Sequence, residues 1–360
     1  MVPCLNQPLL NLQDEASISL SSSNRDMSIY DRTMMNVEHS RDKLNSYLNK
    51  EDFPRILEKC LLNAKEYYQM DHDEELYLAM RRLYTESMGE SSIMINHEIS
   101  RHRPIVSSFY KAAENIQIIS PNLIDGIKTD LQNSGGYAKL LVDIDCCWLD
   151  EIREILDDMT LDVVHNRSAR VIINDWRILS KTKLIQILCR NKNLRYIADN
   201  YLKCRSLINM VSVWKTDYQP RNGHDMNGDA MNFHFDCDHN RFLKVFIYLD
   251  DVTANHGPHV FVEKTSAKYR NSLPESLNRD GRYSSLEVIN AGLVPKIVTG
   301  KKGTIIFADT QNLHRGTPVH FGATRYILQL QFVDSAFGAR PAHKAEDIED
   351  MNTILLEAAS

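Results

Sequence analysis

The sequence predicts a mainly β protein with added helices: a double-stranded β-helix core (the cupin-like jelly roll) with flanking helices and a helical N-terminal extension. One observation is a series of short β-rich segments after residue 232, separated by turn residues: FHFD, FLKVFIYLDDV, HVFVEK, LVPKIVTG, GTIIFAD and TRYILQLQFV. Strands at this spacing are typical of β-sandwiches and barrels. The other is the helical spacing of apolar residues in most of the chain before residue 135.

The N-terminal part divides into a flexible arm over 1–40 and a helical extension over 41–134. The arm is rich in Ser, Asn, Asp and Met without a sustained period, so we expect it to lack stable packing. Pro54 suits the first turn of a helix, and Ser120 and Gly135 suit a helix cap and a helix exit. Apolar spacing predicts helices within four segments: 41–69, 73–88, 102–119 and 120–136. We expect them to form a pad against one face of a sheet.

The predicted core domain spans 135–340, and a tail over 341–360 is expected to be helical. The first half of the core mixes strand and helix patterns. Strands are predicted within 137–145, 168–176 and 207–218, and helices within 147–159 and 181–204. The Gly-, Asn- and Asp-rich segment 221–232 is expected to be a loop.

Composition excludes several classes of protein. The 360 residues are 43% apolar and 25% charged, and the net charge of −6 with no basic tract gives little basis for nucleic-acid binding. Seven cysteines without CxxC spacing favour reduced thiols. No apolar run approaches the ~18 residues that a membrane span needs, and no secretory leader is recognisable. We therefore expect a soluble cytoplasmic protein that acts on a small molecule, with its oligomeric state left open.

The main candidate site combines His234 and Asp236 with the distant His314 and Arg325. Alternate residues of a strand point to the same face, so His234 and Asp236 can direct an imidazole and a carboxylate to one point. With His314 as third ligand, two histidines and a carboxylate form the facial triad of non-haem Fe(II) oxygenases. Arg325 can then pair with a carboxylate-bearing co-substrate.

This ordered pattern resembles the phytanoyl-CoA dioxygenase (PhyH-like) family of Fe(II)/2-oxoglutarate-dependent oxygenases. The resemblance covers roughly 130–335 and includes RFLKVFIYLDDV after the His-x-Asp, the turn in NHGPHVFVEKTS, and GTIIFADTQNLHRG before the distal histidine. It implies Fe(II), 2-oxoglutarate and O₂ as cofactor and co-substrates. It further implies a dioxygenase that hydroxylates an unactivated C–H bond and converts 2-oxoglutarate to succinate.

The resemblance also implies roles for single residues. His234, Asp236 and His314 would hold the metal, and Arg325 would anchor 2-oxoglutarate. Neighbouring strands of the family supply further contacts to 2-oxoglutarate, which here would be Lys244 and Trp214. Lys244 could equally be an edge lysine with its ammonium in water. The carboxylate of Asp236 favours hydroxylation, because related halogenases carry a small residue at that position.

Two departures from the family pattern concern the co-substrate. Glu263-Lys264-Thr265-Ser266 stands where the family has a Gly-Ser-His-like segment, and His256 is inserted in the preceding turn. The hydroxyl that often follows two residues after the distal histidine is replaced by Gly316, with Thr317 next as a substitute contact. No metal ligand is lost by either departure.

Other residues near the motif have alternative readings. Asp238 and His239 lie close enough in sequence to compete as ligands, although His239 should point away. His224 could line a substrate entrance, and Cys237 is expected to pack. The remaining histidines of the region are expected in solvent: His256, His259 and His320. The alternative function is that of a cupin-like jelly-roll protein that binds metal or ligand and either has no catalytic activity or catalyses a different reaction.

Overall fold

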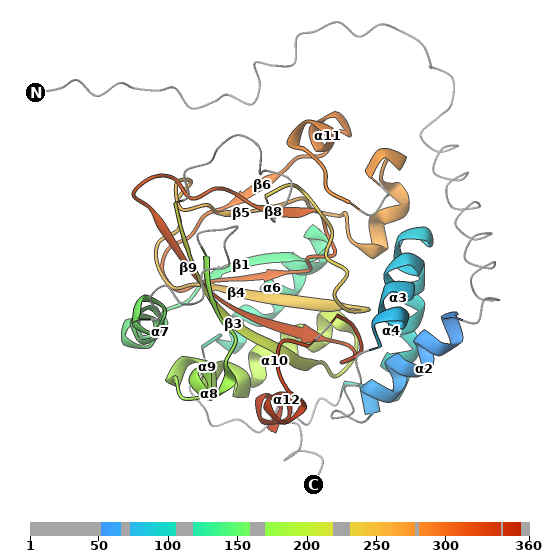
Figure 1. The fold of residues 1–360 in the computed structure, drawn as a ribbon, viewed down its shortest axis with the longest axis horizontal. Coiled ribbons are helices and arrows are strands. Elements are labelled where there is room, and N and C mark those ends of the chain that lie inside the picture. The colour runs from blue at the N-terminus through green and yellow to red at the C-terminus, as the bar shows by residue number, and fades with distance from the viewer. Residues whose placement is uncertain are drawn as a thin grey trace, which may run out of the picture.

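Two antiparallel sheets form the centre of this computed structural model, which describes residues 52–65, 73–105, 118–158, 170–218, 231–277, 281–339 and 341–353. Figure 1 shows the larger sheet below the smaller one. The larger sheet has the strand order β1 (Tyr137–Leu141), β7 (Thr304–Ala308), β4 (Phe242–Tyr248), β9 (Thr324–Val333), β3 (Leu207–Asp217) and β2 (Arg170–Ile173). The smaller one has the order β6 (Lys296–Val298), β5 (His259–Phe261) and β8 (His314–Gly316).

The strands of the larger sheet separate two environments, because successive side chains of a strand point to opposite faces. On β4, Leu243, Val245 and Ile247 join the core on the helix side. Phe246 and Tyr248 join a second cluster that also contains Phe261 and Val298 of the smaller sheet. A separate apolar cluster therefore lies between the two sheets, and we call this region the inter-sheet space.

Helices cover the other face of the larger sheet (Figure 1). The amphipathic ones bury their apolar stripe in one continuous core with Leu243, Val245, Leu328 and Leu330 of the sheet. These helices are α6 (Pro121–Ser134), α7 (Cys146–Asp158), α8 (Trp176–Leu179), α9 (Lys183–Arg190), α10 (Lys192–Leu202) and α12 (Ala345–Met351). Short helical segments η1 (Ala267–Ser272), η2 (Glu275–Leu277) and α11 (Ser285–Asn290) connect strands of the smaller sheet.

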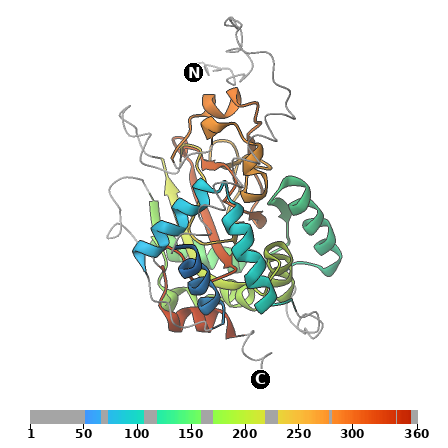
Figure 2. The ribbon, with the colours of Figure 1, turned by 90° about the vertical axis from the view of Figure 1, so that its right-hand side faces the viewer.

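Three N-terminal helices pack against each other beside the sheets, as Figure 2 shows from the side. They are α2 (Asp52–Lys65), α3 (Glu74–Glu86) and α4 (Glu90–His102). Polar side chains of α4 are buried and hydrogen-bonded to the core: Ser92 Oγ donates to Asn240 O at 2.7 Å, and Asn96 Nδ2 donates to Asp334 Oδ2 at 3.1 Å. The extension is thus joined to the sheets by specific hydrogen bonds as well as by apolar contact.

Several predicted elements are confirmed. Pro54 lies in the first turn of α2, and α6 begins after Ser120 and ends at Gly135, whose φ of 75° suits glycine. The predicted strands within 137–145, 168–176 and 207–218 correspond to β1, β2 and β3. The arm over 1–40, most of 102–119 and most of the loop 221–232 with His224 lie outside the described residues.

Other predictions are wrong or incomplete. More described residues lie in helices than in strands, so the protein is mixed α/β, not mainly β. Helix α4 was not predicted, and the segment 181–204 divides at Asn191, whose side chain caps α10 through Leu194 N at 2.8 Å. The FHFD segment forms single bridges at Phe233 and His234 and no regular strand.

Two further findings concern membrane-spanning helices and disulfide bonds. None of the helices in the described ranges combines the length and apolar character needed to span a bilayer. The six cysteines of the described ranges form no disulfide with one another.

Candidate metal centre

His234, Asp236 and His314 converge in the inter-sheet space, as the sequence predicted. His234 Nε2 lies 3.4 Å from Asp236 Oδ1, and His314 Nε2 lies 3.4 Å from Asp236 Oδ2. The three side chains are largely buried, with 13%, 17% and 8% of their surfaces exposed. Around one ion bound at about 2 Å, ligand atoms at right angles lie about 3 Å apart. The donor atoms of the three side chains all lie within 4.8 Å of one another, so they could bind one metal ion after moving closer together.

The backbone explains why residues so far apart in sequence meet. His234 and His314 exchange backbone hydrogen bonds of 3.0 and 3.1 Å in an isolated antiparallel bridge. Asp236 N donates to Thr310 O at 2.9 Å, which fixes the segment two residues further along. The His-x-Asp segment is thus held against the 309–314 loop without forming a regular strand.

Both histidines are held in the tautomer that leaves Nε2 available to bind a metal. His234 Nδ1 lies 2.9 Å from Asn232 O, and His314 Nδ1 lies 3.0 Å from Asn312 O. A carbonyl oxygen only accepts, so each Nδ1 carries the proton and each Nε2 keeps its lone pair. Burial, followed by the neighbouring His314, lowers the pKa of His234 and so favours its neutral form.

Asn312, whose carbonyl orients His314, is itself fixed by hydrogen bonds through its side chain. Its Oδ1 accepts from Thr265 N and Ser266 N, both at 2.8 Å. Its Nδ2 donates to Gly135 O and Asp309 O, both at 3.0 Å. One buried amide therefore ties the loop that carries His314 to two distant parts of the chain.

Lys244 lies beside the triad and is no edge lysine. It is on β4, between β7 and β9, and its Nζ donates to Asp236 Oδ2 at 2.7 Å and to Asp238 Oδ2 at 3.1 Å. Burial by itself raises the pKa of Asp236, but the charge of Lys244, His314 and the histidine hydrogen bonds hold that pKa well below its usual range. Asp236 is thus ionised, with one carboxylate oxygen held by an ammonium.

Arg325 is buried on the strand β9, and its Nη1 donates to Gly257 O. It shares a face of the sheet with Ile327, which belongs to the inter-sheet cluster. His259 lies near it and stacks on His314, with ring centroids 5.4 Å apart and 18° between the rings. Burial, then His314 and Arg325, hold the pKa of His259 well below its usual range. The expectation that His259 lies in solvent is therefore wrong; His320 is exposed, as expected.

Trp214 and Thr317 are the two other residues that the sequence proposes as contacts of 2-oxoglutarate. Trp214 is opposite Ile327 in the sheet register and packs edge-on against Phe246 in the inter-sheet space. Thr317 Oγ1 donates to Pro258 O at 2.8 Å. A carboxylate only accepts, so Thr317 would have to release Pro258 before it could donate to 2-oxoglutarate.

The competing ligands lie outside the triad. Asp238 contacts Lys244, and His239 points away to Asn209 Nδ2 at 2.7 Å and Phe337 O at 3.0 Å. The inter-sheet face of β9 is polar near Lys244: Gln331 stands opposite Lys244 in the register, and Gln329 is next on that face. Within the described ranges, Oε1 of both glutamines is buried without a hydrogen-bond partner. These atoms suit a polar ligand beside the triad.

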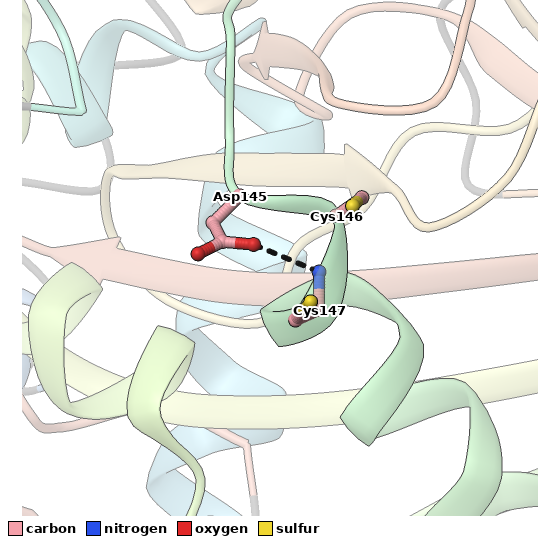
Figure 3. Close-up of side chains that lie close together, drawn as sticks. All are labelled: Asp145, Cys146 and Cys147. Carbon is pink, nitrogen blue, oxygen red and sulfur yellow. Dashed lines mark hydrogen bonds between the residues drawn. The ribbon is translucent and has the colours of Figure 1, made fainter.

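A second group of possible ligands is exposed at the start of α7 (Figure 3). Asp145, Cys146 and Cys147 have donor atoms within 4.8 Å of one another. Asp145 Oδ1 already accepts from Cys147 N at 2.9 Å, the usual role of an aspartate at a helix start. The charge of Asp145, then that of Cys146, raise the pKa of Cys147, which disfavours the metal-binding thiolate.

Neither a family model nor a curated protein sequence matches the chain. Among solved structures, the epimerase SnoN in complex with Fe³⁺, alpha ketoglutarate and nogalamycin RO is 13% identical with a TM-score of 0.44, over 63% of this chain and 90% of its own. HygX from Streptomyces hygroscopicus with nickel, 2-oxoglutarate and hygromycin B is 9% identical (TM-score 0.42; 64% and 100% covered). EctD from S. alaskensis with 2-oxoglutarate and 5-hydroxyectoine is 14% identical (0.41; 66% and 82%). Similarity at this level does not assign an activity, so the site is interpreted from its own residues.

Proposed function

We propose that this chain is an Fe(II)- and 2-oxoglutarate-dependent dioxygenase, in which His234, Asp236 and His314 hold the iron. The observation that carries the proposal is the convergence of two Nε2 lone pairs and one ionised carboxylate in a largely buried space. Two imidazoles and a carboxylate on one side of an ion leave its other positions open, as oxygen chemistry requires. When bound, iron and 2-oxoglutarate would supply O₂ activation, with 2-oxoglutarate converted to succinate.

The protein's own residues bind and orient. Lys244 would keep Asp236 ionised and hold one of its oxygens, which leaves the other for the metal. Arg325 would pair with the distal carboxylate of 2-oxoglutarate, because a buried guanidinium binds a planar carboxylate through two parallel hydrogen bonds. Trp214 would border the co-substrate through its ring.

The finer features of this proposal rest on the sequence pattern. We place the two antiparallel sheets in a PhyH-like double-stranded β-helix over 135–340, with the helical extension over 41–134 outside it. The carboxylate of Asp236 favours hydroxylation of a C–H bond, and the net charge of −6 without a basic tract favours a small-molecule substrate over a nucleic acid.

An anaerobic titration with Fe(II) and 2-oxoglutarate tests the proposal. Chelation of the keto acid at such a triad gives a weak visible charge-transfer band near ~500 nm. We expect the band in the wild-type protein, its loss in His314→Ala and its weakening in Arg325→Ala. His320→Ala, at an exposed histidine outside the site, is the matched control and should keep the band.

Two results would count against the dioxygenase. Failure of the anaerobic protein to bind Fe(II) would remove the metal site itself. Iron binding without the band, unchanged by 2-oxoglutarate, would favour the alternative of a jelly-roll protein that binds metal without this chemistry.

A further inference from the structure

A cavity of about 190 Å³ lies between α6, α10, η1 and the residue before β4. None of the proposed metal ligands lines it. Arg241 lies in the bend that leads into β4, where Leu243 and Val245 face the helices. Lys244, by contrast, faces the inter-sheet space. The cavity is thus separate from the proposed metal ligands, although Gly135 and Ser266 of its wall hydrogen-bond to Asn312, whose carbonyl orients His314.

Four basic side chains line this cavity and no carboxylate does: Lys128, Lys203, Arg241 and Lys268. Their positive charge is only partly balanced. Lys128 pairs with the exposed Asp125 at 3.3 Å, and Arg241 Nη2 lies 3.7 Å from the buried Asp309 Oδ2. In the described part of the chain, neither Lys203 nor Lys268 has an ion pair, and the buried Nε of Arg241 has no hydrogen-bond partner.

The four charges act on one another. Burial, then the charges of Lys128, Arg241 and Lys268, lower the pKa of Lys203. Lys203 ends α10 with a φ of 63°, a conformation in which glycine is the usual residue. A cation at a helix C-terminus is favourable by itself, but that explains only one of the four. Like charges gathered around a cavity point to a ligand that carries the opposite charge.

We propose that this cavity binds the phosphate group of a small organic phosphate monoester. A phosphate monoester has a charge near −2 at neutral pH and several strong acceptor oxygens, which matches a cluster of lysines around an arginine better than a single carboxylate does. The remaining walls include Leu131, Ile197, Tyr201 and Tyr269. They give the organic part an apolar and aromatic surface, and the cavity is several times larger than the ~30 Å³ of one water molecule.

The test measures binding of phenyl phosphate, inorganic phosphate and citrate to the full-length protein by calorimetry, in phosphate-free buffer with a metal chelator. Lys203→Gln and Lys268→Gln each remove one charge from a side chain that lines the cavity and remains partly exposed, so both variants should fold. Lys301→Gln, a fully exposed lysine elsewhere, is the matched control for loss of charge. Since no metal is present, the result is independent of the proposed dioxygenase activity.

We expect saturable binding of phenyl phosphate that is tighter than that of citrate and weakens with added salt. Each cavity variant should lower this affinity at least tenfold, and Lys301→Gln should leave it unchanged. Neutralising Lys203 should not lower the melting temperature without ligand, because it relieves repulsion. Absence of saturable binding, stronger binding of citrate, or equal affinities in all variants would overturn the proposal.

Discussion

Substitution of Lys244 by methionine tests whether this lysine holds Asp236, the carboxylate that we propose as a metal ligand. Methionine keeps the unbranched apolar stem and removes the ammonium. In the wild-type protein that ammonium lies 2.7 Å from Asp236 and 3.1 Å from Asp238, with 10% of the lysine side chain exposed. The variant leaves both carboxylates without their cation in a largely buried setting.

The expected loss of stability follows from that burial. Removing one partner of a buried ion pair costs about 3–5 kcal/mol. Because 17% of the Asp236 side chain and 34% of the Asp238 side chain are exposed, water screens part of the remaining charge. We therefore expect the metal-free variant to lose about 3 kcal/mol of unfolding free energy, near the lower end of that range.

Urea unfolding followed by circular dichroism, with chelator and then with anaerobic Fe(II), measures the effect. A ligand at a hundred times its Kd adds about 2.7 kcal/mol to stability. We expect Fe(II) to restore most of the loss in Lys244→Met, because the ion supplies the positive charge that Asp236 lacks. Lys215→Met is the control: it breaks a pair with Asp157 that is partly exposed, so it should cost at most about 1 kcal/mol.

Equal stability of Lys244→Met and Lys215→Met in chelator would show that Lys244 does not stabilise the buried carboxylates. If Fe(II) stabilises the wild-type protein and leaves the variant unchanged, the prediction is also wrong, since the ion would then not replace the charge of Lys244 beside Asp236.

Three further substitutions test other parts of the molecule. Arg325→Gln should raise the Kd for 2-oxoglutarate about tenfold, or about 1.4 kcal/mol, and leave the Kd for Fe(II) unchanged. Separate calorimetric titrations with 2-oxoglutarate and with Fe(II) measure the two constants. An unchanged affinity for 2-oxoglutarate would exclude Arg325 as its anchor. His343 is buried, and burial lowers its pKa. Its contribution to stability is therefore fully present above its unfolded pKa of about 6.5 and is lost as the pH falls from that value through the lowered pKa of the folded state. His343→Gln should flatten the fall in unfolding free energy between about pH 7 and pH 5, whereas the exposed His320→Gln should not, and identical slopes for both variants would contradict this. Gly136→Ala places a Cβ at a φ of 124° within 2.7 Å of neighbouring side chains, so it should lower the free energy of unfolding by at least about 2 kcal/mol. Gly126→Ala, in a helix with open space around it, should raise the free energy of unfolding by about 0.5–1 kcal/mol. Thermal unfolding compares the two variants.

Where the sequence carried a local signal, the prediction succeeded. Ser120, Pro121 and Gly135 delimit α6 because caps and turns depend on residues that are adjacent in the chain. Helix α4 has no such signal: Ser91, Ser92 and Asn96 occupy its buried face, so its apolar period is weak. Its burial depends on hydrogen bonds to Asn240 and Asp334 that only the folded core provides.

The candidate site likewise has some features that the sequence predicts and others that depend on the folded structure. Spacing was enough to nominate His234, Asp236 and His314, because the pattern of donors is specific. The place of Lys244 was undecided from sequence, since nothing local shows that β4 lies in the middle of a sheet. His259 was misplaced because its stacking on His314 arises from the pairing of β5 with β8, two strands separated by more than fifty residues.

The amide of Asn312 has a consequence for the order of folding. It joins the turn that bears His314 to Gly135, 177 positions away along the chain, and to Thr265, 47 positions away. Contacts between such distant segments form late, because each requires a long loop to close. His314, the third proposed metal ligand, thus acquires its orientation only when three remote stretches have met. Affinity for the ion should consequently appear with the final step of chain assembly, and iron should serve as a probe of complete folding.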